Sequence, residues 1–325
     1  MADEEAVAAS DAPACASVMG CVEARANRVV DLLTRLQEDD DVELIHDVRV
    51  ASRRLAEGLG AVRPALEAER LAGLRAWLRE TRTLLAPARD ADVMTQTLTK
   101  LVDGNGKFSA VPCGVAFIEM LRERRQSVLP DARAQLASTG VLERRQELMD
   151  LLGNGSCCAG DSADTSESGE ADAQVEKKLG RRLRRRVRRR RRTFLRLARR
   201  GAKSGRAARL HAARIACKKI RYALELAHEA KVLDASRELK ALRRLQEGLG
   251  SLNDLTVLRG QLRAFAQEAK SEERAGANKI LRLLKRRRQQ VVKGFVKDWP
   301  KATRRLRKVR ARRTAPDMQP APAEA

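Results

Sequence analysis

Apolar side chains recur at every third or fourth position along most of the chain, which is the spacing of amphipathic helices. The first such stripe runs from Val22 to Leu36 and ends at the acidic residues 38–41. The same spacing predicts further helices at residues 44–62, 66–85, 90–101, 113–129, 131–152, 175–200, 208–230, 235–249, 254–270 and 274–299. Runs of β-branched and aromatic residues, which are typical of strands, are scarce. The pattern therefore predicts an all-α protein.

Breaks in this periodicity set the expected helix ends. Pro64 is expected to stop one helix, and Pro87 to interrupt the chain after the next. Asp90 is well placed to cap the helix that follows, and residues 103–107 (DGNGK) are expected to form a loop.

Composition divides the chain into two halves. Residues 153–173 are rich in Gly, Ser and acidic side chains and have almost no large apolar residue, so they predict a flexible linker. The linker separates helical halves at residues 18–152 and 174–313, with disordered segments expected at 1–17 and 314–325.

Two sequence blocks recur in both halves. Residues 45–59 (IHDVRVASRRLAEGL) align without gaps with residues 210–224 (LHAARIACKKIRYAL) and share His, Arg, Ala and the final Leu. Residues 78–98 align with residues 242–262, where Asp90 matches Asp254. Because both blocks recur in the same order at nearly the same separation, they predict two pseudo-symmetric helical bundles that arose by internal duplication.

Each copy of the first block predicts one apolar and one basic helix face. At about 100° per residue, His46, Arg49 and Arg53 share a face, with Arg54 at its edge. The polar face of the second copy comprises His211, Arg214, Lys218, Arg221 and Tyr222. The residues expected to pack inward are Ile45, Val48, Ser52, Leu55 and Leu59, then Leu210, Ala213, Cys217, Ile220 and Leu224.

Charge narrows the chemistry of these faces. The chain has 67 Lys and Arg against 43 Asp and Glu, a formal net charge of +24, which attracts polyanions. Like charges on one helix face repel, and phosphate oxygens would offset that repulsion because Arg suits bidentate phosphate contacts. A solvated basic face is the common alternative, which the duplication disfavours. For Asp90 and Asp254 we expect a structural role, as helix caps or ion-pair partners.

Several other classes of protein are not supported. The acidic start of the chain does not resemble a signal peptide, and no run reaches the roughly 18 apolar residues of a membrane span, so we expect a cytoplasmic protein without membrane contact. The cysteines follow no zinc spacing, so neither a metal nor another cofactor is expected. Reduced thiols are expected throughout, at Cys15, Cys21, Cys113, Cys157, Cys158 and Cys217. The vicinal pair Cys157 and Cys158 lies in the predicted linker.

The recurring blocks resemble those of the CHAD family, the conserved histidine α-helical domain. The four matching motifs are H-x-x-R-V-x-x-R-R-L at 46–55, R-D-x-D-V at 89–93, H-x-x-R-x-x-x-K-x-x-R-Y at 211–222 and L-G-x-L-N-D at 249–254. The resemblance implies two bundles that enclose a basic groove or pore, binding of inorganic polyphosphate, and association with polyphosphate granules. The residues it assigns to binding are His46, Arg49, Arg53, Arg54, His211, Arg214, Lys218, Lys219, Arg221 and Tyr222.

Some features limit what the resemblance carries over. Ala56 stands where the first family motif often has another basic residue, so the first stripe is expected to bind more weakly than the second. The E-x-E-x-K pattern of family members fused to a triphosphate-tunnel domain is absent, so we do not carry their triphosphatase chemistry over. Arg49 and Arg214 each follow a His by three positions and would repel a divalent cation, so no metal is expected at His46 or His211.

Further basic segments are expected to extend the positive field. An apolar seam formed by Leu179, Leu183, Val187, Phe194 and Leu197 is expected to dock the segment 177–200 and leave its arginines exposed. The residues predicted to make auxiliary contacts are Arg89, Arg185, Arg188, Arg189, Arg192, Lys285 and Arg288.

Nonspecific nucleic-acid binding is the main alternative function, because the same charge would support it. Against it, the sequence has no helix-turn-helix, zinc-finger or RNP pattern and only 2% aromatic residues for stacking on bases. No Walker loop, HExxH or GxSxG motif indicates an enzyme. The sequence leaves the oligomeric state open.

Overall fold

The computed structural model describes residues 17–103, 112–154 and 165–307, and every regular element in these ranges is helical. The predicted all-α class is confirmed. The helices of the first part are α2 (Val18–Glu38), α3 (Val42–Val62), the 3₁₀ turn η1 (Arg63–Ala65), α4 (Ala68–Leu84), α5 (Ala86–Asp103), α6 (Pro112–Ser138) and α7 (Val141–Asn154). The second part contains α8 (Thr165–Ser204), α9 (Ala207–Glu229), α10 (Ser236–Glu268) and α11 (Ser271–Arg307).

Caps and turns explain most helix ends. The Ser17 hydroxyl accepts a hydrogen bond from the Gly20 amide at 2.9 Å, and Asp41 accepts one from the Glu43 amide at 3.1 Å. Pro64 lies in η1 directly after α3, as expected. Gly140 and Gly205 have φ values of 66° and 60° at the α6–α7 and α8–α9 corners, a backbone conformation that glycine adopts without steric penalty.

Three predicted helix boundaries are wrong. Pro130 lies inside α6, which continues to Ser138 and turns at Gly140 instead. Residues 236–268 form the single helix α10, where a break was expected before Asp254. Asp90 lies within α5, which begins at Ala86, so Asp90 and Asp254 are not helix caps.

The predicted linker is partly helical. Helix α7 extends to Asn154 and α8 begins at Thr165, so helical structure enters both ends of residues 153–173. Cys157 and Cys158 lie outside the described residues, as do residues 1–16 and 308–325 at the two ends of the chain. The division into halves at 18–152 and 174–313 remains a prediction.

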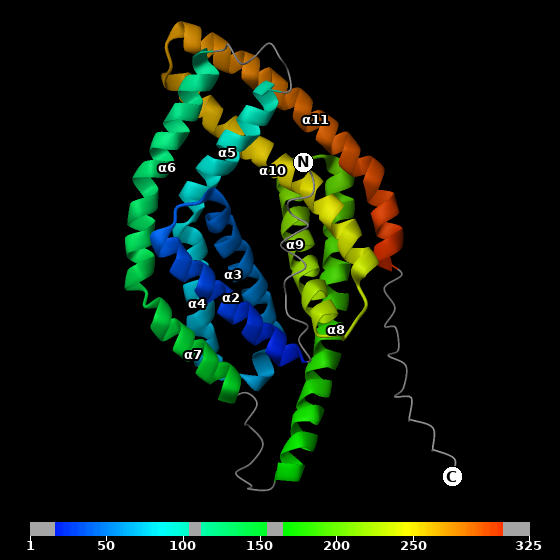
Figure 1. Ribbon diagram of the computed structural model, residues 1–325. Helices are drawn as coiled ribbons and strands as arrows, with labels where there is room; N and C mark the ends of the chain where they lie inside the picture. The colour runs from blue at the N-terminus through cyan, green and yellow to red at the C-terminus, as the bar shows by residue number, and fades with distance from the viewer. Residues whose placement is uncertain (1–16, 104–111, 155–164, 308–325) are drawn as a thin grey trace, which may run out of the picture.

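Both core clusters contain residues from both halves of the chain. The larger cluster is built on helices including α2, α3, α8 and α9. The smaller one joins Leu98 of α5 and Phe117 of α6 to Leu258 of α10 and Ile280 of α11. Figure 1 shows α5 and α10 at the top of the molecule, where α6 and α11 also meet.

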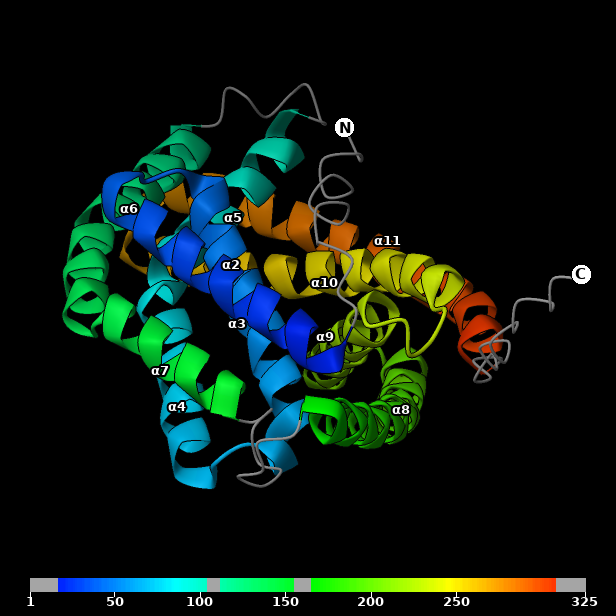
Figure 2. The same cartoon turned by 60° about the horizontal axis from the view of Figure 1, so that its bottom comes forward.

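The arrangement places α3 and α9 next to each other at the centre. Helix α3 contacts α4 on one side and α9 on the other, and α9 also contacts α8 and α10. Figure 2 shows the same order from below, with α4 and α7 to one side of α3 and α8 and α9 to the other. The two helices that carry the repeated basic blocks therefore lie side by side.

Candidate functional site

The faces of α3 and α9 are oriented as their sequence pattern predicted. All five inward-facing positions predicted on each helix are buried, from Ile45 to Leu59 on α3 and from Leu210 to Leu224 on α9. The buried hydroxyl of Ser52 has a hydrogen-bond partner, because it donates to the Val48 carbonyl at 2.7 Å. With their apolar faces in the core, the two helices hold their basic stripes on a common side.

The two stripes meet in one group of side chains. Lys218 of α9 is close enough to His46 of α3 to lower its pKa, and Arg53 of α3 in turn lowers the pKa of Lys218. Arg82 of α4 and Arg89 of α5 also belong to the group, because each lowers the pKa of Arg49. We call this group the central basic cluster, and its members are His46, Arg49, Arg53, Arg82, Arg89, Arg214 and Lys218.

The cluster carries an excess of positive charge. Burial, followed by the charges of Arg214 and Arg53, lowers the pKa of Lys218 to about 6. Burial and then Arg53 likewise lower the pKa values of Arg49 and Arg82 to about 10. The Nε atom of Arg214 is buried and has no hydrogen-bond partner within the described residues. An anion among these side chains would supply the missing hydrogen bonds and offset the repulsion.

The two aspartates of the repeated blocks lie at the edge of the cluster. Burial raises the pKa of Asp90, Arg49 lowers it, and Asp254 raises it again. Asp254 also raises the pKa of Lys218. The two carboxylates therefore come near each other and compensate part of the positive charge. Neither makes an ion pair within 4.0 Å of a cation in the described part of the chain, so the expected ion-pair role is wrong in that respect.

Some predicted binding residues are instead occupied by structural contacts. Glu225 of α9 pairs with Arg54 at 3.0 Å and with Arg221 at 3.2 Å. Burial alone would lower the pKa of Arg54, but Glu225 raises it above its ordinary value. Tyr222 was expected on the polar face, yet only 3% of it is exposed. The centre of its ring lies 5.4 Å from the guanidinium carbon of Arg221. Tyr222 also raises the pKa of Arg53, against the larger lowering effect of burial.

The two histidines make equivalent contacts with opposite hydrogen-bond roles. Arg89 lies 2.8 Å from Nδ1 of His46 and can only donate, so this nitrogen accepts and the ring is neutral. Burial and then Arg89 lower the pKa of His46 to about 4, which agrees with a neutral ring.

His211 contacts Asn253, which occupies the same place in the repeat as Arg89. Nδ2 of Asn253 donates to Asp254 at 3.3 Å, so its Oδ1 accepts from Nδ1 of His211 at 2.8 Å. Nδ1 is therefore the donor in the exposed His211, whereas it is the acceptor in His46.

The auxiliary residues separate into different places. Arg89 belongs to the central basic cluster, whereas the arginines predicted on α8 are exposed and are not among the charges that shift the pKa values of Lys218 or His46; they are Arg185, Arg188, Arg189 and Arg192. Arg185 and Arg189 line a small pocket of about 260 Å³ beside Gly60. Arg288 donates to the Gly205 carbonyl at 2.9 Å and so fixes the α8–α9 corner. Lys219 is exposed, and Lys285 lines a separate pocket on α11.

Sequence reasoning missed Arg82. Its guanidinium donates to the Ser52 carbonyl at 3.3 Å, and Arg49 donates to the Arg82 carbonyl, so α4 and α3 are joined under the cluster. The aligned position in the second half is Gln246, so the comparison of the two blocks gave no signal for Arg82.

The remaining chemistry-bearing groups are buried or dispersed. Within the described residues, no three His, Cys, Asp or Glu side chains are placed to hold a metal ion together. Cys113 and Cys217 are buried free thiols, and burial raises the pKa of Cys217 to about 12. Among the helices described, none has the length and apolar character needed to cross a membrane.

Comparison with known proteins identifies the fold. The crystal structure of the CHAD domain from the plant Ricinus communis aligns over 92% of this chain and 94% of that chain, with a TM-score of 0.61 and 23% sequence identity. PptA from Streptomyces chartreusis aligns over 87% of this chain and 98% of that chain, with a TM-score of 0.57 and 14% identity. No curated protein sequence matched the chain. The sequence model of the CHAD domain matches residues 21–263. The chain therefore belongs to the CHAD domain family.

Proposed function

We propose that the chain binds inorganic polyphosphate at the central basic cluster and does not turn it over. The observation that carries this proposal is the convergence of cations from both repeated blocks into one partly buried group. Burial and mutual repulsion lower the pKa values of Arg49, Arg82 and Lys218 in that group. A ligand that carries many negative charges along its length would offset this repulsion at several cations at once.

Phosphate fits the donors of the cluster. Guanidinium groups present paired N–H donors that match the spacing of phosphate oxygens, and the cluster offers Arg49, Arg53 and Arg214 from opposing helices. Lys218 adds a point charge between them when it is protonated. The neutral His46 can donate from Nε2, since its Nδ1 accepts from Arg89. All of these contacts recognise negative charge and phosphate oxygens. They therefore suit polyphosphate, in which every unit is identical.

Nucleic acid is the second candidate, and the exposed arginines of α8 favour it. These side chains would form a sequence-independent phosphate contact surface on any polyanion. The central basic cluster supports polyphosphate instead, because Tyr222, the aromatic residue of the second repeated block, is only 3% exposed and cannot stack on a base.

A competition experiment with matched variants tests the proposal. Fluorescent DNA bound to the full chain should be displaced by long-chain polyphosphate at equal phosphate concentration and near-physiological salt. Arg214→Gln combined with Lys218→Gln should weaken polyphosphate binding by at least about tenfold, because charge-assisted hydrogen bonds are lost. The control is Arg188→Gln with Arg192→Gln on α8, which removes two exposed cations at the same helical spacing.

The control should reduce affinity clearly less than the central variant. Equal losses in the two variants, or preferential retention of DNA, would show that diffuse surface charge binds the polyanion and would overturn the proposal. Incubation of polyphosphate with the chain and Mg²⁺ should leave the length of the polyphosphate unchanged on gels. In cells, the proposed binding would place the chain at polyphosphate granules, and the central variant should be dispersed from them.

A further inference from the structure

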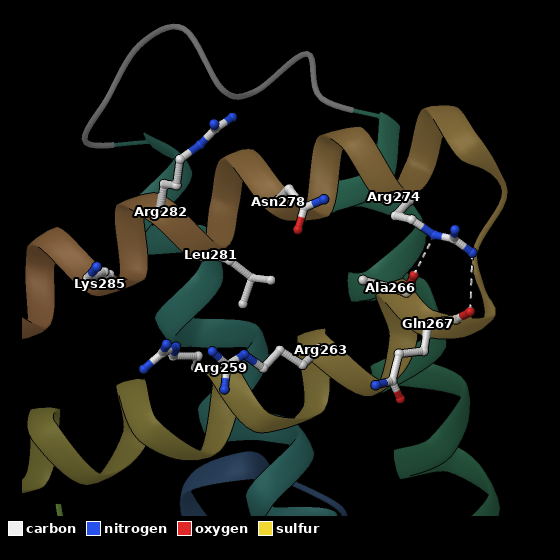
Figure 3. A pocket seen from close by; sticks show the side chains of 9 residues that line it. All are labelled: Arg259, Arg263, Ala266, Gln267, Arg274, Asn278, Leu281, Arg282 and Lys285. Atoms are coloured by element: carbon white, nitrogen blue, oxygen red, sulfur yellow. Dashed lines mark hydrogen bonds between the residues drawn. The ribbon is translucent and has the colours of Figure 1, made fainter.

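A second basic pocket lies between α10 and α11, and the central basic cluster does not include it. It has a volume of about 840 Å³, and its lining residues are Arg259, Arg263, Ala266, Gln267, Arg274, Asn278, Leu281, Arg282 and Lys285. Five of these nine residues are cations and none is acidic. Figure 3 shows Arg259 and Arg263 rising from α10 toward α11, with Leu281 above them.

The cations of the pocket are available to a ligand. Within the described ranges, no hydrogen bond or ion pair engages Arg259, Arg263, Arg282 or Lys285. Arg263, Arg282 and Lys285 are exposed, and Arg259 is half-buried. The amide of Asn278 adds a neutral hydrogen-bonding group to the same wall.

The walls of the pocket are held in place. Arg274 donates to the carbonyls of Ala266 at 3.1 Å and Ala269 at 3.2 Å, so it ties the start of α11 to the end of α10. Beneath the pocket, Leu262 and Ile280 belong to the smaller core cluster. Because both helices are fixed by packing and by this clamp, the pocket cations are presented at a set separation before any ligand binds.

The two arginines of α10 that line the pocket have no cationic counterparts in the first half of the chain. In the alignment of the repeated blocks, Arg259 corresponds to Thr95, and the next turn matches Arg263 with Thr99. The first half therefore offers no cations at these two positions.

We propose that the α10–α11 pocket is a second phosphate-binding site, which takes a short run of linked phosphate groups such as a triphosphate. Arg259 and Arg263 would grip one side of the run and Arg282 and Lys285 the other, and Asn278 would bond to a bridging or terminal oxygen. The phosphates could belong to a segment of polyphosphate or to a nucleoside triphosphate. Occupation of both sites by one polyphosphate chain rests on the function proposed above, whereas the pocket itself does not.

Calorimetric titration of the full chain with tripolyphosphate tests the pocket. The starting protein carries Arg214→Gln and Lys218→Gln, so that the central basic cluster is weakened. One site should remain, and adding Arg259→Gln with Arg263→Gln should weaken it by at least about tenfold. Arg282→Gln with Lys285→Gln, on the opposite wall, should do the same. The control is Lys293→Gln with Lys297→Gln, two exposed cations of α11 outside the pocket, which should change little.

Two further arms identify the source of the phosphates and separate the two proposals. ATP that binds tighter than tripolyphosphate assigns the pocket to nucleotides, and the reverse order assigns it to polyphosphate; either result supports a phosphate site. Unchanged tripolyphosphate affinity in both pocket variants overturns the inference, even if central variants still lose polyphosphate. Conversely, a site that both pocket pairs abolish stands even if the central basic cluster binds nothing.

Discussion

At the scale of single residues, the helical spacing predicted which basic side chains share a face, but not which of their neighbours are buried. His46, Arg49 and Arg53 share a face because of their spacing, and the structure keeps them together. Tyr222 was misplaced because α9 is central, and every residue from Tyr222 to Ala227 is buried. Helical periodicity predicts burial on the assumption that one face of the helix meets solvent. In α9 the contacts with α3, α8 and α10 cover every face between Tyr222 and Ala227. Those contacts between distant segments leave no mark in the periodicity.

The half-buried Lys218 is expected to reduce the stability of the ligand-free chain, because its surroundings disfavour the charged amine. Lys218→Met keeps the length of the side chain and removes an amine that burial and Arg214 disfavour in its charged form. We expect the ligand-free variant to unfold about 2–4 °C higher, a gain of about 1 kcal/mol, while its polyphosphate affinity falls. Lys219→Met, at the exposed neighbouring position, is the control and should leave the melting temperature unchanged.

The pH dependence of this gain follows from the lowered pKa of Lys218. Between pH 6 and 10 the unfolded chain binds more protons at Lys218 than the folded chain does, so the stability of the unmodified chain should rise with pH through this window. Lys218→Met should reduce that rise, and calorimetric melting at several pH values measures it. An unchanged pH profile in the variant would assign the titration to another group.

At the scale of helices, tertiary packing overrides local breakers. Helix α10 crosses Gly248 and Gly250 without a break, because Leu249, Leu252 and Leu255 continue one buried stripe through that region. The aligned segment of the first half is split between α4 and α5 at Pro87, which removes an amide donor that an uninterrupted helix would need. The sequence indicated a break in both copies, and only the proline produced one.

Ion pairs hold α8 against α3. Glu57 of α3 is buried and pairs with Arg186 at 2.6 Å and with Arg190 at 3.1 Å, while Arg186 also donates to the Gly60 carbonyl at 3.0 Å. A Cβ at Gly60 would lie 2.5 Å from the Arg186 guanidinium, so a larger residue there would displace this side chain. Neither arginine stood out from its neighbours in the basic run of α8.

Removing the Glu57 carboxylate should therefore destabilise the chain strongly. Glu57→Ala leaves two partly buried guanidinium groups unpaired, and we expect a loss of about 3–5 kcal/mol in the free energy of unfolding. The matched control is Glu67→Ala, whose exposed carboxylate lies 4.0 Å from Arg70 and should contribute less than about 1 kcal/mol. Urea denaturation measures both, and similar small losses would mean that packing alone holds α8 in place.

At the scale of the whole molecule, the two halves complete each other. Both core clusters contain residues from both halves, and the central basic cluster joins Arg53 of α3 to Arg214 and Lys218 of α9. The aligned blocks predicted two matched faces, but could not show whether these form two sites or one, since that depends on the packing of α3 against α9. The positive charge is also unevenly distributed between structure and site, because four arginines share two buried carboxylates: Arg186 and Arg190 pair with Glu57, and Arg54 and Arg221 pair with Glu225.

A double-mutant cycle across the halves distinguishes one site from two. The first pair is Arg49→Gln with Arg53→Gln, and the second is Arg214→Gln with Lys218→Gln. If the stripes act as one site, each pair alone should remove most of the affinity for polyphosphate, and their combination should remove less than the sum of the two losses. We expect a coupling of about 0.5–3 kcal/mol, the range found for residues that share partners. Binding measured at fixed salt gives this coupling directly.

Additive losses within about 0.5 kcal/mol would instead indicate two independent sites. The larger loss would then show which stripe binds more strongly.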